Sequence, residues 1–86
     1  MGIQPFDREV LGVVVDLHRA TPDCPITAAE IIAALDEDHA KLEIEEALRR
    51  IDDVGGLVEL QRADVHVVNR VTTAAGNLVD EWRTEA

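Results

Sequence analysis

Aromatic residues are almost missing from this sequence of 86 residues, which contains one Phe, one Trp and no Tyr. The hydrophobic 47% of the chain is therefore nearly all aliphatic, and Val, Leu, Ile and Ala have to fill the core. A chain of this length is near the lower size at which a hydrophobic core suffices without disulfides or a metal. We expect a single domain over residues 1–86.

Cysteine is scarce as well, since Cys24 has no second cysteine with which to form an internal disulfide. Small secreted domains usually depend on such bridges, so the lone cysteine favours a reducing compartment. The N-terminus lacks the basic flank and apolar run of a secretory signal, and no apolar stretch approaches the roughly 20 residues of a membrane span. We expect a cytoplasmic protein with no membrane contact.

Positive charge is the third scarcity. Eighteen Asp and Glu residues oppose eight Lys and Arg, of which only Lys41 is a lysine, so the formal net charge is -10. This acid-rich composition resembles that of proteins adapted to high salt, where ions screen the self-repulsion of an acidic surface. An acidic protein that binds another protein has the same composition. The acidity therefore reports either habitat or function, and the composition leaves both open.

Catalytic and metal-binding motifs are also missing. The chain contains no P-loop, no G-x-G-x-x-G, no G-x-S-x-G and no H-E-x-x-H. Cys24, His18, His39 and His66 are scattered instead of standing at the spacing of metal ligands, and the acidic run at 36–38 lacks the alternating ligands of a calcium loop. We expect no enzyme, no cofactor and no metal.

Three helices are predicted in the first two thirds of the chain. The first runs from Asp7, as its N-cap, to Arg19, and prolines end it in the segment 20–25. The second starts near Ala28 behind a capping box of Thr27 and Glu30. Its predicted buried residues are Ile31, Ile32 and Leu35. The third begins at about Glu43 and stops at a glycine pair, with inward residues Ile44, Ala47, Leu48 and Ile51.

The last third predicts a hairpin and a final helix. Strands are expected at Leu57–Arg62 and Val65–Val71 around a turn at Ala63–Asp64, after a brief strand at Ile26. Thr72 or Thr73 caps a helix with an apolar stripe. The fold class is therefore α+β, mainly α, in the order helix, short strand, helix, helix, hairpin, helix.

The segments AAEIIAAL and IEEALRRIDDVGGLVEL together resemble the helix-turn-helix of winged-helix regulators, in which an aliphatic-Gly-Leu-Val corner leads into the wing. Thr-Ala-Ala-Gly at 73–76 is similar to the Thr-x-x-Gly that opens the last helix in MarR-like and PadR-like members. The resemblance implies that the third helix enters the DNA major groove and that basic residues there and in the wing contact DNA. The residues it nominates are Lys41, Arg49, Arg50, Arg62 and Arg70.

The charge of the third helix opposes this role. Glu45 precedes Arg49 and Glu46 precedes Arg50 by four residues, which is the favoured spacing for ion pairs within a helix. From Glu43 to Asp53 the sequence has five acidic residues and two arginines, a net charge of -3 where a DNA reader usually presents positive charge. Two hypotheses follow: a double-stranded DNA-binding transcriptional regulator, or a winged-helix module whose acidic third helix binds a basic protein. An acidic mimic of DNA is a minor third hypothesis.

The first helix carries a second apolar row, Leu11 and Val15. In so small a domain, another element has to pack against this row to bury it. The last helix does so either within the chain or from a second copy, through Leu78, Val79 and Trp82. We expect a homodimer with these five residues at its interface.

Overall fold

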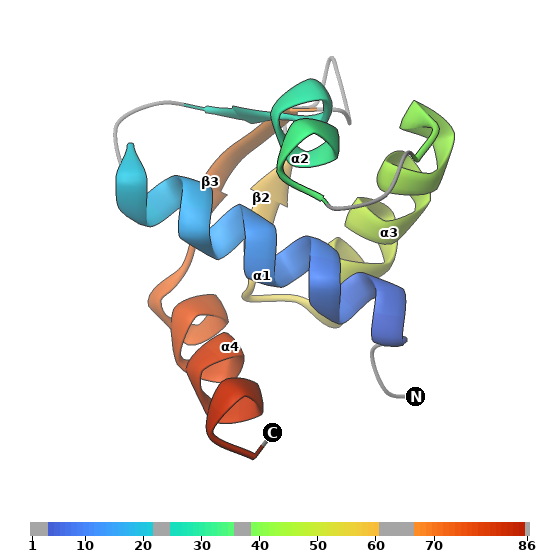
Figure 1. Cartoon of the computed structure of the whole chain (residues 1–86). Coiled ribbons are helices and arrows are strands. Elements are labelled where there is room, and N and C mark those ends of the chain that lie inside the picture. The colour runs from blue at the N-terminus through green and yellow to red at the C-terminus, as the bar shows by residue number, and fades with distance from the viewer. Residues whose placement is uncertain (1–3, 22–24, 36–38, 61–66, 86) are drawn as a thin grey trace.

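The computed structural model describes residues 4–21, 25–35, 39–60 and 67–85. The chain is mainly helical with one small sheet, as the sequence predicts. The elements are α1 (Pro5–Ala20), β1 (Ile26–Thr27), α2 (Ala28–Ala34), α3 (Lys41–Val54), β2 (Val58–Leu60), β3 (Val67–Val71) and α4 (Thr73–Glu85). In Figure 1, α1 crosses in front of β2 and β3, with α2 above it and α4 below it. None of the described helices combines the length and the apolar character that crossing a membrane requires.

The start of α1 differs from the prediction. Gln4 is the N-cap and Pro5 occupies the first helical turn, where its missing N–H costs nothing. The expectation that Asp7 caps the helix was wrong, because Asp7 lies inside the first turn and its side chain is buried. It bonds to a distant arginine instead of the local backbone.

The capping box that begins α2 is confirmed. The Thr27 hydroxyl accepts from the Glu30 amide at 3.3 Å, and the Glu30 carboxylate accepts from the Thr27 amide at 3.4 Å. Of the predicted inward residues, Ile31 is fully buried, whereas Ile32 and Leu35 are half-buried. The acidic residues 36–38 lie outside the described residues.

Helix α3 begins at Lys41, two residues before the predicted start, and ends before a glycine pair. Its four predicted inward residues are all fully buried; they are Ile44, Ala47, Leu48 and Ile51. Gly55 and Gly56 have φ angles of 82° and 76°, which side chains larger than hydrogen disfavour. The glycine pair therefore allows the chain to turn directly from α3 into β2.

The three strands form an antiparallel sheet in the order β1-β3-β2. Val58 lies opposite Val71 and Glu59 opposite Arg70, and the register then shifts so that Leu60 faces Val68. The predicted pair of strands is confirmed at Val58–Leu60 and Val67–Val71. The predicted turn at Ala63–Asp64 lies outside the described residues.

The core is aliphatic, as the composition requires, and it includes the second apolar row of α1. Leu11 and Val15 are buried, and so is Val79 of α4. Helix α4 packs against α1 within the same chain, so these three side chains present no surface to another molecule in this arrangement. Leu78 and Trp82, the other two residues expected at a dimer interface, are half-buried against the core.

Thr72 joins the start of α4 to the turn after α3. Its hydroxyl accepts from the Ala75 amide at 3.3 Å. Of the two threonines that the sequence offers as the cap, Thr72 and Thr73, the cap is therefore Thr72. The same hydroxyl lies within hydrogen-bond distance of the Gly56 and Leu57 carbonyl oxygens, and the Thr72 amide donates to Leu57 at 3.0 Å. One side chain thus orders both the α3–β2 corner and the α4 N-terminus.

Replacing Thr72 with Ala removes the cap and the contact with the corner, so we expect Thr72→Ala to lower the free energy of unfolding by about 1–2 kcal/mol. The matched control is Thr73→Ala, which removes the neighbouring exposed hydroxyl and is expected to cost less than about 0.5 kcal/mol. Urea unfolding followed by circular dichroism measures both. Equal losses in the two variants would contradict this role of Thr72.

Candidate interaction surface on α3

The outward side of α3 is mainly acidic. Glu43, Glu46, Asp52 and Asp53 are exposed, and Glu45 is half-buried. An apolar side chain is exposed near each end of the helix, Leu42 at 62% and Val54 at 53%. We call these seven residues together the acidic α3 face. Neither of these two apolar side chains belongs to the core.

Arg49 is paired as the sequence predicts. Its guanidinium donates to the Glu45 carboxylate over a distance of 2.7 Å, with the partners four residues apart on α3. The Arg49 side chain is 61% exposed and that of Glu45 18%, so the arginine side of the pair faces the solvent. Exposed pairs of this kind contribute little to stability, and Arg49 can exchange its partner for an external anion at small cost.

Arg50 points in a different direction from its neighbour. It donates from Nε at 2.9 Å and from Nη2 at 2.8 Å to the two carboxylate oxygens of Asp7, in a two-point contact between α3 and α1. The Asp7 side chain is only 2% exposed and that of Arg50 39%. The bonded partner of Arg50 is therefore Asp7, whereas Glu46, the partner that the sequence predicts, acts on Arg50 through its charge alone.

The charge environment of Arg50 agrees with this geometry. The hydrogen bond to Asp7 is the main cause that raises the pKa of Arg50 above its ordinary value, and the charges of Asp7 and Glu46 act in the same direction while burial opposes them. A guanidinium held in this way is a structural group. Arg50 is thus already paired within the chain, while 39% of its side chain remains exposed.

The other nominated basic residues are dispersed. Lys41 is exposed at the first position of α3. Arg70 is exposed on β3, where Glu59 is its cross-strand neighbour. Arg62 lies outside the described residues, so its position relative to the others stays a prediction. Among the described residues, acidic side chains are therefore clustered on α3, whereas the nominated basic side chains are not.

His39 lies next to the N-terminal end of the acidic α3 face. Its Nδ1 lies 2.8 Å from the Glu43 carboxylate, and its ring is 4.8 Å from that of Phe6 between ring centres. This histidine is therefore held by an acidic and an aromatic neighbour. Among the residues that the structure describes, no three His, Cys, Asp or Glu side chains gather closely enough to hold a metal ion. His66 and Cys24 lie outside that part of the chain.

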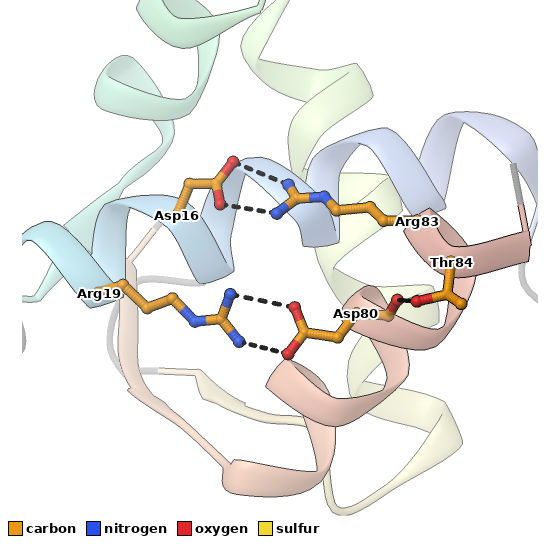
Figure 2. Close-up of polar contacts among 5 residues, drawn as sticks. All are labelled: Asp16, Arg19, Asp80, Arg83 and Thr84. Carbon is orange, nitrogen blue, oxygen red and sulfur yellow. Dashed lines mark hydrogen bonds and ion pairs between the residues drawn. The ribbon is translucent and has the colours of Figure 1, made fainter.

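Two further ion pairs join α1 to α4, and the sequence reading missed them (Figure 2). Arg19 and Asp80 meet at 3.0 and 3.1 Å through both oxygens, and Arg83 meets Asp16 at 2.8 and 3.1 Å in the same way. The hydrogen bond from Arg19 is the main cause that lowers the pKa of Asp80, and the corresponding bonds raise the pKa of both arginines. The sequence signal for these pairs is an Asp-x-x-Arg spacing that occurs in both helices. It is not recognised when the pattern of each helix is considered separately.

A groove of about 530 Å³ lies beside these pairs, between α1, the end of α2 and α4. Its charged lining is mixed, with Arg8 and Arg83 against Glu9 and Asp16. Arg8 lies over the Trp82 ring at 5.0 Å, and Arg83 is bonded to Asp16. The groove therefore presents no group of charges of one sign, in contrast to the acidic α3 face.

Comparison with known proteins found no match to a family model, to a curated protein or to a solved structure.

The adjacent arginines of α3 should differ sharply in their effect on stability. Arg50→Ala leaves the Asp7 carboxylate buried without its partner, and we expect a loss of about 3 kcal/mol in the free energy of unfolding. Arg49→Ala is the matched control, with an expected loss below about 1 kcal/mol because its pair is exposed. Chemical denaturation at neutral pH measures the two values. A loss for Arg50→Ala as small as that of the control would show that Arg50 is free to serve a ligand.

The pKa of Asp80 provides a test of the α1–α4 pairs. Because the folded pKa lies below the usual 3.8, the pair stabilises the fold above that pH and the stabilisation is lost as the pH falls through the lower folded value. We expect Arg19→Gln to raise the pKa of Asp80 more than Arg83→Gln, since Arg19 bonds to Asp80 directly and Arg83 acts through space. Titration of the carboxyl carbon by NMR measures the shift. An equal effect of the two variants would contradict the direct bond.

Proposed function

We propose that this chain is a winged-helix domain in which α3 is the recognition helix. The support is the order of elements, with a short strand before the α2–α3 pair and a β2–β3 hairpin directly after α3. The corner at Gly55 and Gly56 leads from α3 into the sheet, as the resemblance in the sequence implies. Because many folds of this kind bind quite different partners, the function has to be argued from the surface of α3.

We propose further that α3 binds a basic surface on another protein. The observation that carries this proposal is the contact of Arg50 with Asp7 of α1, which leaves the unpaired exposed charges of α3 mainly acidic. Arg49 is already neutralised by Glu45, and Lys41 is confined to the first turn. Opposite charge across an interface speeds encounter and excludes partners of the wrong sign. Leu42 and Val54 then supply apolar contact at the two ends of the face.

DNA binding with a role in transcription is the second candidate. The observation in its favour is that Lys41, Arg49 and Arg70 are exposed on α3 and β3, the elements expected to approach the duplex in a winged helix. An acidic surface that reflects a high-salt habitat also permits DNA reading through base contacts and shape, since salt weakens phosphate contacts for every binder. The two candidates use different residues of the same region, so they are separable.

The test of protein binding uses matched charge reversals. The full chain is immobilised and exposed to an extract of its source cell at moderate salt, alongside Glu46→Lys/Asp53→Lys and the control Glu9→Lys/Glu81→Lys. The total charge of the two variants is equal, so nonspecific electrostatics change equally. We expect one basic protein, identified by mass spectrometry, to bind the wild type and the control at similar levels and the α3 variant at least about tenfold less. Equal capture by all three chains would contradict the proposal.

The DNA candidate is tested by fluorescence anisotropy with pooled duplex fragments across a salt series. Binding through α3 to protein alone predicts no saturable DNA binding even at low salt. Saturable binding that Lys41→Gln and Arg70→Gln each weaken, with a shallower salt dependence in each variant, would instead establish the second candidate.

A further inference from the structure

The groove between α1, α4 and the end of α2 lies on the outer side of α1. The residues that α1 contributes share one stripe of the helix; they are Arg8, Glu9, Gly12, Val13 and Asp16. Val10 and Val14, on the other side of α1, are buried in the core. In Figure 1, α2 lies above α1 and α4 below it. Helix α1 is therefore the floor of the groove, and the other two helices form its walls.

The groove contains apolar side chains that the fold covers only in part. Val13, Leu35 and Trp82 line it, and each of them is half-buried. A ligand that fills the groove therefore removes further apolar surface from water, which favours binding. The groove has a volume of about 530 Å³, within the range of about 300–1,000 Å³ that is usual for small-molecule sites.

Two of the four carboxylate and guanidinium groups in the groove are already paired. Asp16 and Arg83 bond to each other at 2.8 and 3.1 Å. Arg8 and Glu9, in contrast, form no ion pair in the part of the chain that the structure describes. They do not neutralise each other, because consecutive residues of a helix point in different directions. The groove thus offers one unpaired positive charge and one unpaired negative charge.

The guanidinium of Arg8 is held in an orientation that suits a carboxylate. It lies over the Trp82 ring, 5.0 Å from the ring centre. Stacking of this kind uses the flat face of the guanidinium and leaves the N–H groups in its plane available to donate. Two parallel N–H groups match the two oxygens of a carboxylate. Trp82 therefore positions Arg8 at the edge of the groove for an acidic group.

Gly12 gives a second, independent indication of a ligand. Glycine inside a helix is less favourable than alanine, so its presence in the floor of the groove calls for a reason. A Cβ atom placed on Gly12 would lie 3.6 Å from Nη2 of Arg83, which is an ordinary contact distance. The packing of α4 on α1 thus admits alanine here. Glycine keeps the floor open, as close approach of a ligand to the backbone requires.

The two unpaired charges restrict the class of ligand. Glu9 repels a simple carboxylate and Arg8 repels a simple amine, whereas a zwitterion satisfies both residues. In an α-amino acid the two charges are carried on one carbon atom, which fits two adjacent residues of α1. We propose that the groove binds a free α-amino acid with an apolar side chain. Its carboxylate bonds to Arg8, its ammonium group to Glu9, and its side chain lies between Leu35 and Trp82.

This proposal does not depend on the proposed function of α3. The groove shares no residue with the acidic α3 face. Binding of an amino acid and binding of a basic protein are therefore separate properties, and each can fail without the other.

The first experiment titrates the full chain with L-leucine and with two analogues that each lack one charge. Isocaproate has no ammonium group and isoamylamine has no carboxylate. Trp82 is the only tryptophan, so its fluorescence reports occupancy of the groove. We expect saturable binding of leucine with a Kd of about 1 mM or tighter, and binding at least about tenfold weaker for each analogue. No saturable response to leucine at moderate or high salt, or an analogue that binds equally well, would overturn the proposal.

The second experiment changes the groove. Arg8→Gln and Glu9→Gln each remove one charge and should weaken leucine binding at least about tenfold. Glu81→Gln is the matched control, because Glu81 is exposed on α4 outside the groove, and its affinity should equal that of the wild type. A wild-type affinity in Arg8→Gln or Glu9→Gln would place the leucine elsewhere and refute the site.

Gly12→Ala separates binding from stability. Alanine favours the helix, so we expect a higher midpoint of urea unfolding, while the added methyl group in the floor lowers the affinity for leucine at least about fivefold. A general loss of folding would lower both quantities together. An affinity for leucine that stays unchanged in this variant would contradict the position of the ligand over Gly12.

Discussion

Asp7 can hold its carboxylate inside the protein only because Arg50 reaches it from α3 with two nitrogen atoms. A buried carboxylate without such a partner is costly, so this contact determines how α1 lies against α3. It also neutralises one of the two arginines of α3, because Arg50 is paired with a carboxylate of another helix. The fold and the character of the candidate surface therefore depend on the same ion pair.

Local patterns in the sequence predicted most of the fold, because helical periodicity and capping act over three or four residues. The inward positions of α3, the capping box of Thr27 and Glu30 and the strands after the glycine pair are of this kind. The partner of Arg50 cannot be predicted in this way, because Asp7 is 43 positions away in the sequence. The rule for ion pairs within a helix is satisfied equally well by the carboxylate four positions away. The choice between them depends on tertiary packing, which a reading of one helix does not contain.

The sequence predicted which kinds of residue the candidate surface contains, but not how they are arranged. The acidic excess of α3 is visible from a count of its residues, whereas the pairing of Arg50 with Asp7 of α1 is not. The α1–α4 contact was visible in principle, because the same Gly-x-x-Val-Asp-x-x-Arg pattern occurs twice. It went unrecognised because two helices far apart in sequence have to be compared position by position before their complementarity emerges.

The acidic α3 face and the α1–α4 contact use charge in different ways. With no Tyr and few other aromatics, the protein lacks the large side chains that usually anchor interfaces, and charged groups have to supply selectivity. On α3 the charges are largely of one sign, so they create a field that attracts basic partners and weakens as salt rises. Between α1 and α4 equal numbers of each sign cancel, so the contact has little long-range field and depends on the spacing of its four charged residues. A single small domain thereby combines a helix pair whose charges cancel with a helix whose exposed charges are mainly acidic.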